Sequence, residues 1–454
     1  MTTFVKFCLE GAFDIRLRQG GNRGAHSEMT EAPIASDRPL QGCKVIELGS
    51  TVAGPFCGRL LADFGADVIK VEQKDGDAVR SMGKRHGSRS LYAASIFRNK
   101  RNVSIDLRRP EGRALVASMC EKADIVVENF KPGTLERWGL GYETLSKANP
   151  GLIMVRISGY GQTGPYSARP GYGVVCEAVS GMREITGDPD RPPARVAVSL
   201  TDYITGLYGA FGAAMALLSR NMTGRGQIVD AALYESAFSF MEPHVPAFQQ
   251  LGVVARRAGP RLPDNTPNSL YPTGDGRYVH IAAITNSLFG RLAGAMGQPE
   301  LMENPRFSDP VARSEHEDDL DKLIGEWTSR LSVSEVEAVL QGVNVPVSRI
   351  FDMRDIFGDP HYAARGAIAM AEDDELGPVA MPNVVPRLSE TPGRIDWPGR
   401  PIGADTLSVL EKDLGLSLTE IARLIDDEIL YTGEEIAGVE PTEVLAHANA
   451  GGSK

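Results

Sequence analysis

The sequence predicts an α/β fold built on a parallel β-sheet. Short runs rich in β-branched residues end in glycine or a turn, as buried strands do, and they alternate with stretches of helical character. The first of these sets covers residues 44–72 and has the length of one β-α-β unit. Two strands joined in this way lie parallel in one sheet, with a right-handed crossover between them.

Local signals place the individual elements. A first strand over 44–49 leads through the turn Ser50–Pro55 into a helix over 55–65, with proline in its first turn and glycine at its end. That turn lacks the G-x-G-x-x-G fingerprint, which disfavours a nicotinamide-dependent enzyme. We expect further strands over 66–72, 99–108, 123–130 and 150–161, helices over 110–122 and 131–140, and a turn, strand and helix over 224–238.

The texture of the chain predicts more than one domain, and 454 residues are enough for two. Proline and glycine become dense from about residue 249, and a mixture of strands and amphipathic helices follows. Helical texture returns near the end, over 406–424. We therefore expect a disordered N-terminal extension (1–39), the first part of a large domain (40–235), a linker (236–250), a small inserted α+β domain (251–350), a linker with the second part of the large domain (351–438) and a flexible tail (439–454).

Composition limits the classes of partner. The formal net charge of -11 argues against general nucleic-acid binding, which needs a basic face. The five cysteines are scattered and include no C-x-x-C pair, which predicts a reduced, cytoplasmic protein. The seven histidines form no H-x-x-x-H or H-x-H pair, so we expect no metal site. The apolar run Tyr203–Leu218 is too short and too rich in glycine for a membrane span.

The stretch Val196–Arg220 holds a single carboxylate, Asp202, followed by an apolar, glycine-rich run. A charge at the mouth of a buried helix is costly unless it is paired, hydrogen-bonded or used. Thr201 and Asp202 are both plausible N-cap residues, because their side-chain oxygens can accept the free N–H groups of a first helical turn. From the spacing alone, a structural cap and a carboxylate nucleophile are both open interpretations.

The predicted topology brings several loops together. Ligands in open α/β sheets bind beyond the carboxyl ends of the strands. Segments 51–53, 129–130 and 158–161 each follow a predicted strand, so we expect them at one edge of the sheet. A basic stretch lies nearby in the chain and would suit phosphate groups, or would simply be solvated surface charge: Arg80, Lys84, Arg85, Arg89, Arg98, Lys100 and Arg101.

Several blocks in a fixed order carry a family resemblance. They read V-A-G-P-F, G-A-D-V-I-K-V-E, N-K-R-N-V-S-I-D-L, V-E-N-F-K-P-G, S-G-Y-G-Q-T-G-P-Y, the Asp202 helix, T-G-R-G-Q-I-V-D and V-P-V-S-R-I. Together they cover roughly 40–427, and the chain resembles the class III CoA-transferases of the formyl-CoA transferase or CaiB/BaiF type. The resemblance is nearest to the branch acting on small dicarboxylic acids. The family also contains α-methylacyl-CoA racemases.

The resemblance implies a fold and a set of site residues. The large domain is Rossmann-like and formed from both chain ends, with the small domain inserted, and two subunits interlock as a homodimer. CoA or acyl-CoA is the substrate and no cofactor is bound permanently. The catalytic aspartate of the family falls on Asp202. Its CoA-contacting positions fall on Val52, Ala53, Ile105, Arg108, Asn129, Phe130 and Arg137, while a position that is basic in a well-known member is Gln73 here.

The implied chemistry needs a lone carboxylate and a dry site. Asp202 attacks the donor thioester, an aspartyl anhydride and then an aspartyl-CoA thioester form, and the acceptor acid reverses the sequence. Exclusion of water requires a lid. The oxyanions that form during the reaction require N–H donors. We expect these in the segments 158–164, with Gly159 and Gly161, and 258–268, while Tyr172 is a candidate for lining the acyl pocket.

Three other functions remain as alternatives. A racemase of this fold needs a histidine and a glutamate as opposed acid and base. Tyr172 stands at the histidine position and Thr285 near the glutamate position, so racemisation is disfavoured. Gly173 also departs from the G-Y-D motif of many transferases, which affects the expected acid-binding contacts. Intramolecular CoA transfer within a dicarboxylyl-CoA and a non-enzymatic CoA-binding role are the other two.

Overall fold

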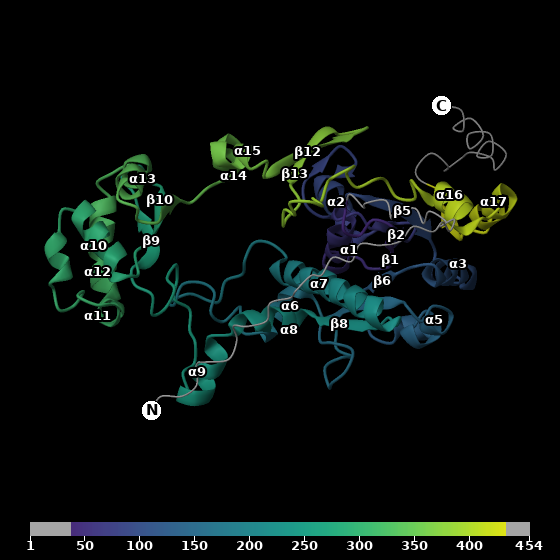
Figure 1. Ribbon diagram of the computed structural model, residues 1–454, viewed down its shortest axis with the longest axis horizontal. Helices are drawn as coiled ribbons and strands as arrows, with labels where there is room; N and C mark the ends of the chain where they lie inside the picture. Colours follow the sequence, from purple (N-terminus) through teal and green to yellow (C-terminus); the bar gives the residue numbers. More distant parts are fainter. Residues whose placement is uncertain (1–37, 433–454) are drawn as a thin grey trace, which may run out of the picture. The chain divides into compact units, whose positions relative to one another are not determined.

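A seven-stranded sheet forms the centre of the large domain in the computed structural model, which describes residues 38–432 (Figure 1). The strands follow the order β14-β5-β2-β1-β6-β7-β8. All neighbours are parallel except β14, which runs antiparallel to β5. The bounds are β1 Lys44–Glu47, β2 Asp67–Glu72, β5 Lys100–Ile105, β6 Ile125–Glu128, β7 Ile153–Ser158, β8 Ile228–Ala232 and β14 Leu430–Tyr431.

This sheet confirms the predicted α/β class and shows that both ends of the chain build it. Leu430 of β14 pairs with Ile105 of β5, more than three hundred residues earlier in the chain. The expected extension lies outside the described residues apart from 38 and 39, and the expected tail lies outside them entirely.

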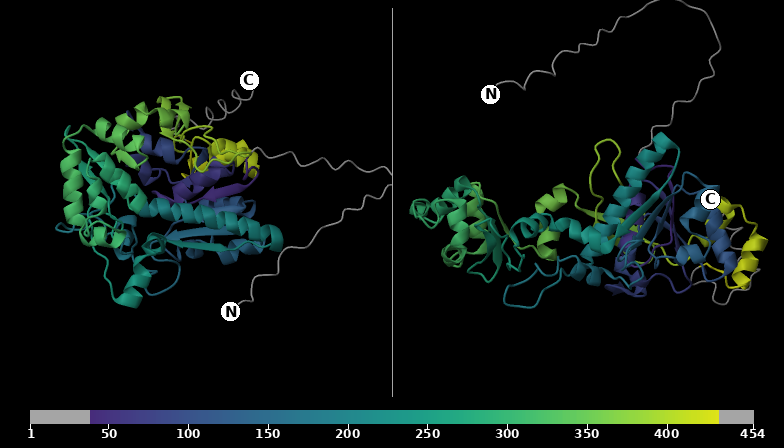
Figure 2. Two further views of the ribbon diagram at one scale, coloured as in Figure 1. Left: turned by 60° about the vertical axis from the view of Figure 1, so that its left-hand side comes forward. Right: turned by 90° about the horizontal axis from the view of Figure 1, so that it is seen from below.

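Helices cover both faces of the sheet. The helices α1 (Ala53–Asp63) and α7 (Leu200–Thr223) pack on one face, and α3 (Pro110–Glu121), α5 (Tyr142–Ala148) and α17 (Leu418–Asp426) pack on the other. Figure 2 shows α7 as the longest of these helices. Its contact with α1 is close, because a Cβ atom at Gly206 would lie 2.7 Å from the Ala53 carbonyl oxygen. Glycine is therefore needed where the two helices meet.

Shorter elements connect the main ones. Two small strands, β3 (Arg85–His86) and β4 (Arg89–Ser90), form a hairpin after β2. The predicted linker, 236–250, is itself largely helical. The remaining short helices of this part are α2 Leu91–Ile96, α4 Thr134–Arg137, α6 Gly173–Val179, α8 Leu233–Phe238 and α9 His244–Leu251.

The predicted α+β texture of the inserted segment is present. A three-stranded antiparallel sheet has the order β11-β10-β9 and shares a hydrophobic core with several helices. The strands are β9 Asn268–Pro272, β10 Tyr278–Ala282 and β11 Val347–Arg349; the helices are α10 Asn286–Ala295, α11 Pro310–Glu315, α12 Glu317–Thr328 and α13 Val333–Gly342. Two helices, α14 (Met353–Gly358) and α15 (Pro360–Ala364), and a hairpin of β12 (Ile368–Asp373) and β13 (Gly377–Pro382) follow.

The segment 406–424 is helical, as expected, but the helix is interrupted. Helix α16 (Thr406–Val409) runs into a π-helical turn, Leu410–Leu414, and stops where Gly415 takes a φ of 79°. Helix α17 then starts afresh, because the Ser417 and Glu420 side chains form a capping box. The helical periodicity of the segment was real, but glycine in the left-handed region ends the first part.

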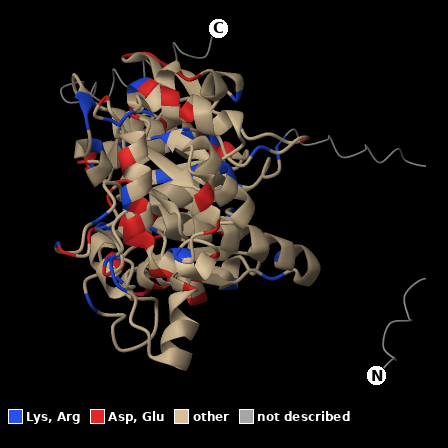
Figure 3. Cartoon of the chain, turned by 90° about the vertical axis from the view of Figure 1, so that its left-hand side faces the viewer, with Lys and Arg blue, Asp and Glu red and all other residues tan. Residues whose placement is uncertain are grey.

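Charge and thiol patterns agree with the composition. Figure 3 shows basic and acidic residues interspersed over the described chain. No helix between residues 38 and 432 is long and apolar enough to cross a membrane. Within the same range, Cys43, Cys57, Cys120 and Cys176 are all free thiols.

Candidate active site

Asp202 lies in the first turn of α7, and neither Thr201 nor Asp202 caps the helix. The N-cap residue is Ser199, which makes no side-chain capping hydrogen bond. The cap interpretation of the sequence was therefore wrong, because the helix starts earlier than its apolar run. The Thr201 hydroxyl is buried and has no hydrogen-bond partner among residues 38–432. The Asp202 carboxylate is not at the N-cap position, although its own backbone N–H in the first turn interacts with it.

The carboxyl ends of β1, β6 and β7 bring the predicted loops to one edge of the sheet. These three strands are neighbours and run parallel, so the turn after β1, Asn129 after β6 and Gly159 after β7 share that edge. Asn129 ties two of the loops together. Its Oδ1 accepts a hydrogen bond from the Ser50 N–H at 2.8 Å, and its Nδ2 donates to the Ser50 carbonyl at 2.7 Å.

The carboxylate of Asp202 packs directly on Gly173, the first residue of α6. A Cβ atom built on Gly173 would lie 2.0 Å from Asp202 Oδ2, so any larger residue would displace the carboxylate or the helix. The loop that leads to α6 is equally tight, because a Cβ at Gly159 would lie 2.5 Å from the Cα of Gly171. Glycines thus allow the approach of three backbone segments around Asp202.

The two predicted pocket residues beside this point differ in position. Tyr172 is the N-cap residue of α6 and its side chain is 58% exposed. Gly161 has a φ of 84° and lies nearer to Asp230 of β8, whose carboxylate accepts a hydrogen bond from the Gln162 N–H at 3.0 Å. Tyr172 therefore directly precedes Gly173, on which the Asp202 carboxylate packs. Gly161 instead turns its loop toward β8.

Burial raises the pKa of Asp202 to about 6, although its own backbone N–H and the positive charge of Arg195 act in the opposite direction. Sequence reasoning missed Arg195. Two other arginines of the same segment are paired, Arg183 with Glu177 and Arg191 with Asp188. Among the described residues Arg195 has no acidic partner, and its Nε donates to the Val196 carbonyl at 3.3 Å.

Two phenols, from α2 and α7, form a pair within electrostatic reach of the carboxylate. The hydroxyls of Tyr203 and Tyr92 are 2.7 Å apart, so one donates to the other. The Tyr203 ring meets Phe56 of α1 edge-on, with 4.7 Å between ring centroids. The charge of Asp202 is one of the causes that raise the pKa of Tyr92, after burial and the contact with Tyr203. Tyr92, from α2, was also missed, because nothing in its local sequence marks it.

The residues predicted to contact CoA follow strands β1, β5 and β6. Val52 and Ala53 form the start of α1, Ile105 ends β5, and Asn129 and Phe130 follow β6. Arg137 ends α4 and donates to the Thr134 hydroxyl at 3.0 Å. The structure therefore gathers them at the same edge as Asp202, and their contacts with CoA stay a prediction.

Charged groups around this edge are distributed differently from the family pattern. Arg108 is 68% exposed and forms a bidentate pair with Asp106, with Nη2 2.8 Å from Oδ2. Gln73 is exposed after β2, and the ammonium of the next residue, Lys74, lies 4.8 Å from the centroid of the Tyr431 ring. Lys74 thus offers a cation beside the position where the family member has one.

Lys84 and Arg85 of the basic stretch are exposed, and Arg80, Arg85 and Arg89 line one cavity, whereas two other members of the stretch have a different role. Arg98 and Lys100 are fully buried, so they neither face solvent nor line an open phosphate site. Arg98 donates to Asp63 through Nε at 2.9 Å and Nη2 at 2.7 Å, and Lys100 lies 2.6 Å from Glu47. These pairs join strand β5 and the residues before it to strand β1 and helix α1, and only three-dimensional contact reveals them.

The second predicted lid segment, 258–268, is tied to the small domain. The Arg261 guanidinium lies 2.7 Å from Asp321 and 3.1 Å from Glu317, both on α12. The Thr266–Pro267 peptide bond is cis. Whether this segment closes over the site stays a prediction.

Comparison with known proteins decides the family. The sequence pattern of CoA-transferase family III matches residues 40–406. The chain belongs to that family. It is 46% identical over 389 residues to the succinyl-CoA–D-citramalate CoA-transferase of Chloroflexus aurantiacus, covering 85% of this chain and 97% of the relative. It is 32% identical over 411 residues to the human succinyl-CoA:glutarate CoA-transferase, covering 90% and 93% respectively.

A solved structure supports the same assignment for this family III protein. The crystal structure of a CaiB/BaiF family protein from Brucella suis is similar with a TM-score of 0.74 and 34% identity, over 82% of this chain and 99% of that one. The predicted family and fold class are therefore confirmed. Because the relatives are CoA-transferases, this chain is a class III CoA-transferase.

Proposed function

We propose that this enzyme transfers CoA from an acyl-CoA donor to a small dicarboxylic acid, with Asp202 as the nucleophile. The observation that carries the proposal is the position of Asp202. Its carboxylate is outside the N-cap position, packs on Gly173 and lies near the edge of the sheet where the predicted CoA residues gather. A carboxylate in such a place costs stability, which is the expected sign of a catalytic group.

The first half of the reaction converts Asp202 into a thioester. An Asp202 oxygen attacks the donor carbonyl carbon, the carbon–sulfur bond breaks, and a mixed anhydride and the CoA thiolate result. The thiolate then attacks the Asp202 carbonyl, the anhydride carbon–oxygen bond breaks, and the donor acid leaves as a carboxylate. Asp202 now carries CoA as a thioester.

The second half runs these steps in reverse with the acceptor. The acceptor carboxylate attacks the Asp202 carbonyl and releases the thiolate, forming a second anhydride. The thiolate attacks the acceptor carbonyl, which yields acceptor-CoA and restores the Asp202 carboxylate. No step needs ATP or metal, since each exchanges acyl groups of similar energy.

The surroundings of Asp202 fit two demands of this route. Anhydrides hydrolyse, so water must be kept out, and the tight packing at Gly159, Gly171 and Gly173 serves that end. The oxyanion of each tetrahedral intermediate needs donors. The phenol pair of Tyr92 and Tyr203 has a hydroxyl proton that is not used between them, and the charge of Asp202 acts on Tyr92.

The acceptor class is supported by two lines. Relatives of this chain act, by name, on citramalate, malate and glutarate with succinyl-CoA. In addition, Arg195 acts electrostatically on Asp202 and lacks an acidic partner among the described residues. A guanidinium in this position suits the second carboxylate of a dicarboxylic acid. A shift of CoA between the two carboxyls of one acid would use the same groups.

Assembly as an interlocked homodimer in the cytoplasm is part of the proposal. One face of α7 carries a stripe of exposed apolar side chains at helical spacing: Leu207, Phe211, Met215, Leu218 and Met222. Phe211 is 58% exposed and Met222 is 82% exposed. A stripe of this length on a helix next to the site suits a second copy of the chain.

Racemisation is disfavoured by the residues that occupy its two positions. Tyr172 cannot exchange protons as a histidine does near neutral pH. The Thr285 hydroxyl oxygen is engaged as the N-cap of α10, where it accepts the Leu288 N–H at 3.3 Å. Solvent deuterium is therefore expected to stay absent from the α-carbon of the acyl group during turnover.

Trapping of the covalent intermediate tests the proposal. Incubation with succinyl-CoA followed by hydroxylamine and mass spectrometry should place the modification on Asp202. Asp202→Ala and Asp202→Asn should lose transfer while still binding CoA. Transfer by either variant would refute the nucleophile. A panel of acyl-CoA donors against mono- and dicarboxylic acceptors would establish the substrate pair.

A further inference from the structure

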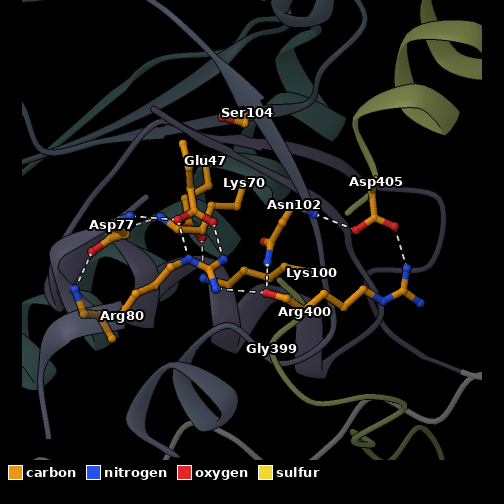
Figure 4. Close-up of polar contacts among 12 residues, drawn as sticks. Glu47, Lys70, Asp77, Arg80, Lys100, Asn102, Ser104, Gly399, Arg400 and Asp405 are labelled. Atoms are coloured by element: carbon orange, nitrogen blue, oxygen red, sulfur yellow. Dashed lines mark hydrogen bonds and ion pairs between the residues drawn. The ribbon is translucent and has the colours of Figure 1, made fainter. Parts of the chain in front are cut away.

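A buried cluster of charges lies beneath the turn between β1 and α1. It joins the carboxylates of Glu47, Glu72 and Asp77 to the cations Lys70, Arg80 and Lys100 (Figure 4). Lys70 Nζ lies 2.9 Å from Asp77 and 3.1 Å from Glu47, and these three side chains are at most 1% exposed. Burying such a cluster costs free energy, which indicates a role beyond packing.

The cluster forms three hydrogen bonds with the backbone of the turn. Lys70 Nζ donates to the Gly49 carbonyl at 2.8 Å, and Lys100 Nζ donates to the Pro55 carbonyl at 2.7 Å. Between them, Asp77 Oδ1 accepts the Thr51 N–H at 2.9 Å. The turn thus sits on charged groups whose own positions are set by strands β1, β2 and β5.

Thr51 shows that the turn is held in an unfavourable shape. Its φ is 68°, in the left-handed region that β-branched residues avoid. Such an outlier is unfavourable and persists only where surrounding contacts impose it. Asp77 supplies the contact. Burial by itself would raise the pKa of Asp77, but Lys70 and the N–H groups of Val79 and Thr51 lower it, so the carboxylate is ionised.

The imposed shape determines where α1 begins. Val52 is the N-cap residue and has no side-chain capping hydrogen bond. No residue within 38–432 accepts a hydrogen bond from the N–H groups of Val52, Ala53 or Gly54. These donors follow the carboxyl end of β1, and the residues that carry them are buried. Ala53 also abuts Gly206, one turn along α7 from Asp202, so the turn sets the distance between its N–H groups and the nucleophile.

We propose that Asp77 and Lys70 are positioning residues for the CoA moiety: they hold the strained Thr51 turn so that Val52 and Ala53, the predicted CoA-contacting residues of this turn, stay in register with Asp202. The proposal rests on the proposed function, which makes CoA the ligand of this edge. Asp77 and Lys70 touch the turn and not the ligand, so they act through Thr51 and Gly49.

A matched pair of variants tests this role. Asp77→Asn removes the charge that pairs with Lys70 and weakens the hydrogen bond from the Thr51 N–H. Asp63→Asn breaks a comparably buried ion pair, with Arg98 at 2.7 Å, that does not touch the turn. Both should lower the unfolding temperature. Only Asp77→Asn should raise the Kd of coenzyme A, by about tenfold or more, with the KM for acyl-CoA rising in parallel and kcat changing less.

A second variant covers the case in which Asp77→Asn does not fold. Thr51→Gly relieves the strain and leaves the ion pairs intact, so the protein should become no less stable. Because the turn is then free to leave its imposed shape, the Kd of coenzyme A should rise severalfold. A purely structural role for the cluster predicts the opposite, namely unchanged affinity in a more stable protein.

Calorimetric titration with coenzyme A itself separates this proposal from the proposed function. Equal affinity in the wild type, Asp77→Asn and Thr51→Gly, or an equal loss in Asp63→Asn and Asp77→Asn, would overturn the positioning role. If the wild type binds CoA but transfers none, only the transferase mechanism is refuted. The Kd values of the variants would still test the positioning role of Asp77. A wild-type protein that binds no CoA would refute both.

Discussion

Gly173 leaves room for the nucleophile: the space that a Cβ atom would fill there lies 2.0 Å from the Asp202 carboxylate oxygen. The two residues are distant in the chain and come from different helices, α6 and α7. The position of the carboxylate is thus defined by a residue with no side chain.

Gly173→Ala should therefore disable the enzyme without unfolding it. The new methyl group must push the carboxylate aside or shift the start of α6, and misplacement of a reacting group by about 1 Å costs on the order of a hundredfold in rate. The measurement is the rate of CoA transfer, with circular dichroism as the check on folding. Gly294→Ala is the control, because a Cβ there meets nothing within 4 Å. Wild-type turnover by Gly173→Ala would show that the carboxylate is not held where the structure has it.

The pH dependence of transfer should follow the ionisation of Asp202. Its pKa is about 6, and only the ionised form is a nucleophile, so activity should rise with pH through that value and level off above it. Arg195→Gln removes a positive charge that lowers this pKa, so the rising limb should move to higher pH. Arg191→Gln, in the same segment and paired with Asp188, is the control. If the rising limbs of the pH–activity profiles coincide for all three proteins, Arg195 does not influence the ionisation that controls transfer.

Replacing the nucleophile should stabilise the fold. The folded-state pKa of Asp202 is raised above its unfolded value, so the folded protein binds the proton more tightly and loses stability as pH rises from about 4 to about 6. The shift from 3.8 to about 6 corresponds to at most about 3 kcal/mol at pH 7.5. Asp202→Asn should unfold at a higher denaturant concentration than the wild type at pH 7.5, and the advantage should vanish near pH 4. Asp190→Asn, an exposed site, should show no such pattern.

The apolar stripe of α7 should be needed for assembly. Phe211→Glu puts a charge in the middle of the stripe and should convert a dimer to monomers, with loss of transfer, because burying an unpaired charge is costly. Light scattering coupled to size-exclusion chromatography measures the mass. Val311→Glu, at an exposed apolar position on α11, is the control. A variant that remains dimeric and active would place the interface elsewhere.

Much of the fold was predictable because it depends on neighbours in the chain. The strand–helix–strand order over 44–72 follows from β-branched runs and from the proline and glycine at helix ends, and the structure has β1, α1 and β2 there. The family blocks likewise marked Asp202, whose position beside an apolar helix is visible in the sequence. The break at Gly415 was missed, because a glycine within a helical pattern does not reveal its φ.

The sequence by itself determined the order of the elements, the parallel sheet, the family and the candidate nucleophile. Tertiary structure decided which charges are buried, as with Arg98 and Lys100, and which glycine admits the carboxylate. It also decided that Asp77 holds Thr51 and that Arg195 acts on Asp202. The reason is physical: hydrogen bonding, desolvation and close packing depend on groups that meet only when distant segments fold together, and no local pattern encodes those meetings.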